Sequence, residues 1–164
     1  MVSGLAGEAQ LAAPDPARWE GRRDRALLAL CAQAGLRVAE LIGLNSGDVT
    51  VGSPTNVRCL GKGRKHRSVP LNTATARLLG TWATERGGRG DEPLFPTRTG
   101  RRLSPDAVER IVAKHARTAF SRDHTFPAER IHPHVLRHYV DGWVMWPAVM
   151  FAVVGGPRGP VPAT

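Results

Sequence analysis

Residues 55–71 have the sequence TNVRCLGKGRKHRSVPL, and this stretch decides the expected fold. Two short runs rich in β-forming residues, TNVRCL and HRSVPL, flank a glycine-containing GKGRK segment. Runs of this kind on either side of a tight turn are typical of an antiparallel hairpin. Together with the VTV run shortly before it, the segment 48–71 is therefore expected to form a small antiparallel sheet whose hairpin tip is strongly basic.

Helices are expected before and after this sheet, because apolar residues recur at three-to-four spacing and capping residues stand at the boundaries. The first follows a charged first turn, EGRRDR, and is expected to be amphipathic. Asn72 is placed to cap a later helix, and the run Ser104-Pro105-Asp106 is a good helix start. The expected helices are Trp19 to Gly35, about Arg37 to Leu44, Thr73 to about Arg86, Ser104 to about Ala119, and a last one from His132 through Val140.

These elements define an α+β fold, mainly helical with a small antiparallel sheet. Residues 1–18 are rich in Ala, Gly and Pro and are expected to form a flexible arm. Residues 19–140 are expected to form one domain, because no break in composition interrupts them. Residues 141–164 drift into Gly and Pro and are interpreted as an aberrant tail, which a frameshift would explain.

The composition favours a nucleic-acid partner. The 164 residues carry a formal net charge of +9, with a pI near 11.1, and such a balance attracts phosphate polyanions. A basic proteome offers a plainer explanation of the same charge. Cys31 and Cys59 belong to no metal-binding or disulfide pattern, and neither a signal peptide nor a membrane span is expected, so we expect a cytoplasmic protein.

Four basic side chains are candidates for chemistry: Arg37, Lys62, His134 and Arg137. Taken singly, each has a plainer explanation. An arginine on a helix is usually solvated or in a surface ion pair, and a lysine at a hairpin tip solvates an exposed turn. His134 and His138 stand at the i, i+4 spacing of a metal site, but no third ligand stands out, so no metal is expected.

The order of three motifs changes this interpretation. GLRVAEL at residues 35–41, GKGRKHRSVPL at 61–71 and HVLRH at 134–138 resemble the tyrosine recombinase or phage integrase family, including its Xer-like members. The resemblance covers about residues 19–140 and implies the C-terminal catalytic domain of that family. Three motifs in the right order make it far more specific than any short motif alone.

The resemblance implies a mechanism and a role for each matching residue. In the family a tyrosine attacks the scissile DNA phosphate and forms a phosphotyrosyl intermediate without metal or cofactor. By resemblance, Arg37 and Arg137 stabilise the charged phosphoryl oxygens, which suits bidentate guanidinium groups. Lys62 donates a proton to the leaving oxygen, and His134 hydrogen-bonds the phosphate or assists proton transfer. Glu40 matches the acidic residue that orients the site.

The expected partners follow from the same resemblance: double-stranded DNA and other recombinase protomers. Contacts to the DNA backbone would position the protein without reading sequence. The side chains expected to make them surround the hairpin tip: Lys62, Arg64, Lys65, His66 and Arg67.

The chain departs from the family after the third motif. The usual motifs that lead to the nucleophilic tyrosine are missing, and Tyr139 is the one tyrosine in the sequence. Residues two apart on a helix point about 200° apart, so Tyr139 and Arg137 would not face one phosphate. We therefore expect a domain truncated before its nucleophile and unable to cleave DNA. The alternatives are a non-catalytic DNA-binding remnant, or a partner of a full-length recombinase that supplies the tyrosine in trans.

Overall fold

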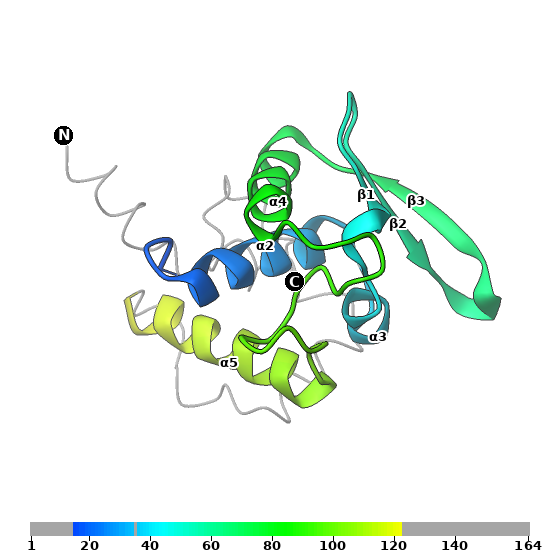
Figure 1. The fold of residues 1–164 in the computed structure, drawn as a ribbon. Coiled ribbons are helices and arrows are strands. Elements are labelled where there is room, and N and C mark those ends of the chain that lie inside the picture. Colours follow the sequence, from blue (N-terminus) through cyan, green and yellow to red (C-terminus); the bar gives the residue numbers. More distant parts are fainter. Residues whose placement is uncertain (1–14, 35, 123–164) are drawn as a thin grey trace, which may run out of the picture.

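The computed structural model describes residues 15–34 and 36–122, and Figure 1 shows their arrangement. A small sheet lies at one side of the helices, and its β2–β3 hairpin projects away from them. The elements in chain order are α2 (Trp19–Ala34), α3 (Val38–Ile42), a 3-10 turn (Ser46–Asp48), β1 (Val49–Thr50), β2 (Asn56–Leu60), a second 3-10 turn (Lys62–Arg64), β3 (His66–Pro70), α4 (Thr73–Arg86) and α5 (Pro105–Arg122).

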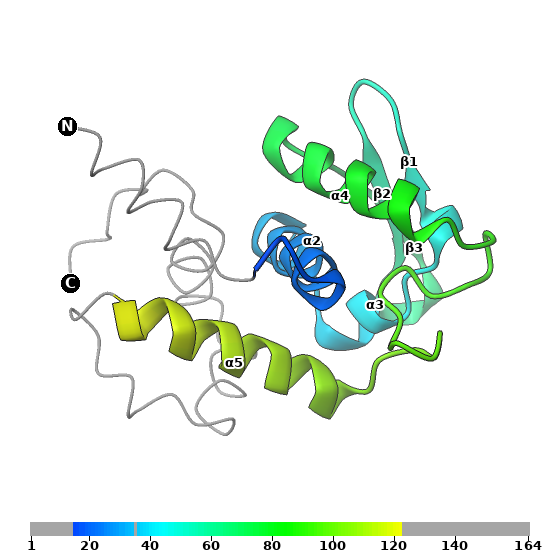
Figure 2. The same ribbon diagram turned by 60° about the vertical axis from the view of Figure 1, so that its left-hand side comes forward.

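Helix α2 is the centre of the fold. It lies between α4 and α5 in both ribbon views (Figures 1 and 2). Six consecutive residues, Ala26 to Cys31, are buried, so the helix is enclosed on several sides. The predicted apolar face is buried and the predicted start at Trp19 is confirmed, but the burial extends to Leu28 and Ala29 beyond that face. The complete burial of Cys31 raises the pKa of its thiol to about 12.

Two charged residues near the start of α2, Arg23 and Asp24, are also part of the interior. Asp24, only 2% exposed, accepts from Arg23 Nε at 2.9 Å and lies 2.7 Å from His115 Nε2 on α5. Arg23 donates in addition to the carbonyl of Pro96 and lies over the ring of Trp19. Because charges are buried only where they are paired and hydrogen-bonded, this network explains how α2 carries two charged residues into the core.

The sheet has the order β1-β2-β3, with both pairs antiparallel. Val57 and Cys59 of β2 are buried against the helical body, whereas Arg58 and Leu60 between them are exposed. Residues directly opposite each other in an antiparallel pair lie on the same face. Cys59 is opposite Arg67, so Arg67 lies on the inner face of the hairpin.

The caps of α4 and α5 match their predicted starts. Asn72 Oδ1 accepts from the Thr75 amide at 2.8 Å, and Ser104 Oγ accepts from the Ala107 amide at 3.1 Å. Gly87 ends α4 in the left-handed conformation at φ 56°, which glycine adopts without steric cost. On the buried side of α4, Trp82 donates Nε1–H to the carbonyl of Leu94.

The described residues confirm the predicted fold class, a mainly helical α+β arrangement with a small antiparallel sheet. None of their helices combines the length and the apolar character that a membrane span requires. The helix expected from His132, the tail at 141–164 and residues 1–14 of the arm lie outside the described residues.

Candidate functional site

Arg37 stands directly before α3, at its N-cap position. Its backbone is extended, at φ −71° and ψ 155°, and its side chain is exposed. Among the described residues, no side chain or carbonyl forms a hydrogen bond or ion pair with its guanidinium. The first residue of the predicted set is thus a solvent-facing cation available to an anionic ligand.

Helix α3 is too short to be stable alone, since isolated helices below about 12 residues are marginal in water. Leu41 buries its side chain in the core, which fixes one face of the helix. The other end is held by Arg102, whose guanidinium donates to the carbonyls of Ile42 and Leu44 and to Asn45 Oδ1. A cation at carbonyls that a helix end leaves unpaired is a favourable arrangement.

Glu40 connects α3 to the hairpin. Arg67 Nη2 donates to Glu40 Oε2 at 2.9 Å, and Arg67 Nε donates to Cys59 Sγ at 3.2 Å. The Glu40 side chain is only 12% exposed, whereas that of Arg67 is 48% exposed. The hydrogen bond to Cys59 and the nearby Glu40 carboxylate both raise the pKa of Arg67, so the arginine stays charged.

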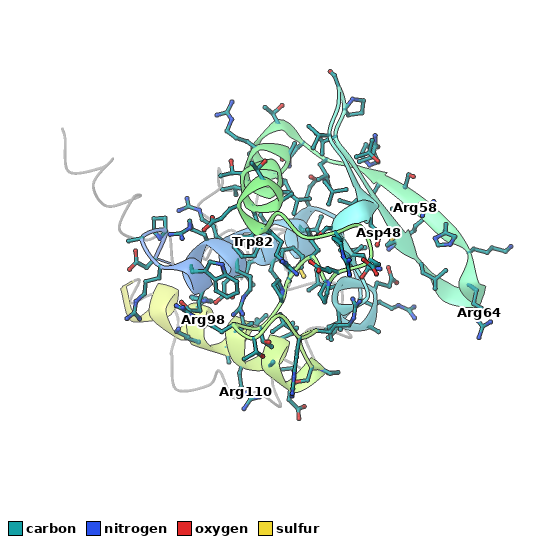
Figure 3. The ribbon with its side chains drawn as sticks, in the orientation of Figure 1. Asp48, Arg58, Arg64, Trp82, Arg98 and Arg110 are labelled. Carbon is teal, nitrogen blue, oxygen red and sulfur yellow. The ribbon has the colours of Figure 1, made fainter. Side chains whose placement is uncertain are left out.

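The hairpin tip presents cations to solvent. The 3-10 turn Lys62–Arg64 closes the tip, and the Gly61 amide donates to the Lys65 carbonyl at 2.8 Å. Arg64 and Lys65 are exposed and have no side-chain partner in the described part of the chain. Figure 3 shows Arg64 at the far end of the hairpin, away from the helical body. For Lys62 the structure describes the backbone but not the side chain.

Arg64 has the left-handed backbone conformation, with φ 59°, directly after Gly63 with φ 75°. A residue with a Cβ pays roughly 1–2 kcal/mol for this conformation, and such strain is most common at functional positions. The tip therefore holds an arginine at a position where glycine would adopt the backbone conformation without this cost.

Most described arginines away from the tip are engaged. Arg22 pairs with Glu85, Arg98 with Glu20, and Arg86 with Glu92. In contrast, no acidic residue occurs between Asn56 and Asn72. Carboxylates thus pair with several cations of the helical body, whereas Arg64 and Lys65 at the tip have no carboxylate partner among the described residues.

The structure describes one part of the predicted site, and the other part lies outside the described residues. Arg37, Glu40 and the backbone of Lys62 belong to neighbouring elements, α3 and the hairpin. His134, Arg137 and Tyr139 lie outside the described residues, so their placement stays a prediction. Within residues 15–34 and 36–122, no three His, Cys, Asp or Glu side chains gather as metal ligands would.

Sequence reasoning missed two features around the site. Arg102 had no assigned role, and its contacts to α3 span 57 to 60 positions of sequence. Asp24 and His115 are 91 positions apart, and no local pattern links them. Arg67 was expected to contact DNA. In the structure it pairs with the buried Cys59 across the hairpin, so it lies on the inward side of β3.

Comparison with known proteins agrees with the three motifs. Tyrosine recombinase XerC of Rhodospirillum centenum is 40% identical over 131 residues, which cover 79% of this chain and 36% of the relative. Tyrosine recombinase XerC of Xylella fastidiosa is 38% identical over 118 residues, covering 72% of this chain and 38% of the relative. The chain thus spans about two fifths of the length of these relatives.

The fold has a counterpart among solved structures. The XerH site-specific recombinase, in a pre-cleavage complex with its difH substrate, matches with a TM-score of 0.54 at 23% identity. The match covers 84% of this chain and 40% of XerH, and it shows a shared fold. Residues 9–144, most of the sequence, match the phage integrase family. The chain therefore belongs to the phage integrase family.

Proposed function

We propose that this chain supplies the phosphate-binding half of a site-specific DNA recombinase or integrase. The reaction is DNA strand cleavage and rejoining through a phosphotyrosyl intermediate, and the ligand is double-stranded DNA. The observation that carries the proposal is a set of exposed cations, before α3 and at the hairpin tip, that have no partner in the described part of the chain. Arg37 before α3, and Arg64 and Lys65 at the hairpin tip, have no partner among the described residues.

The chemistry of this set suits a phosphodiester. Guanidinium groups bind phosphate oxygens in a bidentate manner, and their charge stabilises the extra negative charge of the transition state. In the proposed site Arg37 and Arg137 hold the phosphate, Lys62 protonates the leaving oxygen, and His134 hydrogen-bonds the phosphate. Lys62, Arg64, Lys65 and His66 contact the DNA backbone. XerH, whose fold is similar, is solved bound to its difH substrate.

The nucleophile is the open part of the mechanism. Tyr139 is the one tyrosine in the 164 residues and stands two positions after Arg137. If residues 137–139 are helical, the two side chains diverge by about 200°. We therefore assign Tyr139 no catalytic role, and cleavage requires a tyrosine from outside these residues, for example from a complete recombinase acting in trans.

The test combines a binding and a cleavage measurement. Fluorescence anisotropy on a labelled duplex of about 30 base pairs should show a logarithm of affinity that falls linearly as the logarithm of the salt concentration rises. A nicked duplex, incubated with the chain and run on a denaturing gel, should show no covalent adduct. Binding that ignores salt would contradict the phosphate-binding role, and an adduct that disappears in Tyr139→Phe would contradict the assignment of the nucleophile.

A further inference from the structure

Arg67 differs from the other cations of the hairpin in where its side chain goes. Arg64 and Lys65 are exposed and have no partner within the described part of the chain, and His66 lies opposite the exposed Leu60 on the outer face. Arg67 lies opposite the buried Cys59, on the inner face, and its guanidinium contacts both Cys59 and Glu40. Two of its donor nitrogens are therefore used inside the protein.

The ion pair joins two elements that carry separate parts of the proposed site. Glu40 belongs to α3, which starts directly after Arg37. Arg67 belongs to β3, two residues after Lys65 and five after Lys62. The hairpin projects from the body (Figure 1), and Cys59↔Arg67 is the second residue pair from its tip. An attachment at this pair therefore limits where the tip lies.

We propose that Arg67 is a positioning residue that ties the β2–β3 hairpin to α3, and not a contact to DNA. This inference rests on the proposed function: the role of Arg67 is to hold Lys62 and Arg37 at a fixed separation across one phosphate. Cys59 Sγ completes the attachment, because it orients the Nε edge of the same guanidinium. Arginine suits this role better than lysine, since its planar fork serves two acceptors at once.

Hydrogen exchange without DNA tests the attachment itself. Arg67→Gln removes the charge and keeps a polar side chain of similar reach. We expect the amides of β2 and β3 to exchange about fivefold faster, because a local attachment limits their opening. Glu40→Gln should give the same effect, and the double variant no more than either single one. In the variant that combines Arg67→Glu with Glu40→Arg, the hydrogen-exchange rates of these amides should return toward those of the native chain.

Salt dependence of duplex binding separates positioning from direct contact. Loss of one phosphate contact makes the slope of log affinity against log salt less steep, by about 0.9. We expect this change in Arg64→Gln, with hairpin exchange as in the native chain. Arg67→Gln should weaken binding and leave the slope as it was, and Arg67→Lys should recover part of the lost affinity. Thermal melts of all variants check that each one is folded.

Two results would overturn the inference: unchanged hairpin exchange in Arg67→Gln, or a slope lowered in Arg67→Gln as in Arg64→Gln. A native chain without salt-sensitive duplex binding would instead refute the proposed function. The exchange measurements would then still decide whether Arg67 holds the hairpin to α3, so the two failures are distinguishable.

Discussion

Two arginines show how differently the helical body and the β2–β3 hairpin use the same side chain. Arg23 in α2 is 7% exposed and donates to Asp24 and to the Pro96 carbonyl. Arg64 at the hairpin tip is exposed, has no partner among the described residues and sits in a left-handed backbone. The body uses arginine to satisfy buried acceptors. The hairpin keeps arginine available, which is what binding an external anion requires.

The comparison predicts that charge removal in the body affects folding most. Asp24→Ala leaves Arg23 and His115 without their shared carboxylate in a buried site. We expect a loss of about 3–5 kcal/mol in the free energy of unfolding, measured by urea denaturation. Asp91→Ala, which removes an exposed carboxylate, is the matched control and should stay within about 0.5 kcal/mol of the native chain. A loss below about 1 kcal/mol in Asp24→Ala would show that the buried network contributes little.

The next effect concerns α3, which connects the two regions. Arg102→Ala removes the donors to the Ile42 and Leu44 carbonyls and to Asn45. We expect a loss of about 1–2 kcal/mol, smaller than in Asp24→Ala because Arg102 is exposed and water replaces part of the bonding. Arg101→Ala, at the adjacent exposed arginine, serves as the control. Equal melting temperatures for the two variants would contradict the role of Arg102 at the end of α3.

At the hairpin tip we expect stability and DNA affinity to change in opposite directions. Arg64→Gly relieves the left-handed strain of a residue with a Cβ, so the folded state should gain up to about 1 kcal/mol. The same change removes a proposed phosphate contact and should lower duplex affinity. Thermal melts and anisotropy on one protein preparation measure both quantities. If Arg64→Gly binds DNA as tightly as the native chain, the exposed Arg64 side chain does not contribute to DNA binding.

The smallest expected effect is the ion pair of Glu20 and Arg98 on the surface of the body. The hydrogen bond from Arg98 lowers the pKa of Glu20 from 4.5 to about 2. A lowered carboxyl pKa stabilises the fold above about pH 4.5, and this contribution is lost as pH falls toward 2. In Arg98→Gln the pKa of the Glu20 carboxyl should rise toward 4.5, measured by NMR titration. Titration of the native Glu20 near 4.5 would mean that the ion pair does not persist in solution.

The sequence predicted the local features and failed for the long-range ones. The starts of α4 and α5 were predictable because Asn72 and Ser104 cap their own helices over three positions. The hairpin was predictable because alternation and turn residues act locally. The burial of Asp24 was not, because it depends on His115, 91 positions away. Charged residues near a helix start are exposed in most helices, and only tertiary pairing overrides that tendency.

The candidate site shows the same division. Arg37, Glu40 and Lys62 were identified from motifs, and the structure places them on α3 and the neighbouring hairpin. The pairing of Glu40 with Arg67 could not be inferred from the motifs, although the alternation of β2 already indicates which hairpin residues face inward. Composition shows that this segment is basic. The strand register decides which of its cations stay available.

The most direct test of the account is the salt dependence of duplex binding for three proteins. They are the native chain, the double variant Arg64→Gln with Lys65→Gln, and Arg110→Gln, an exposed α5 arginine that Figure 3 places far from the tip. The account predicts that the slope of log affinity against log salt falls by about 1.8 in the double variant and stays unchanged in Arg110→Gln. Equal slopes for all three proteins would contradict the claim that the hairpin tip holds DNA phosphate.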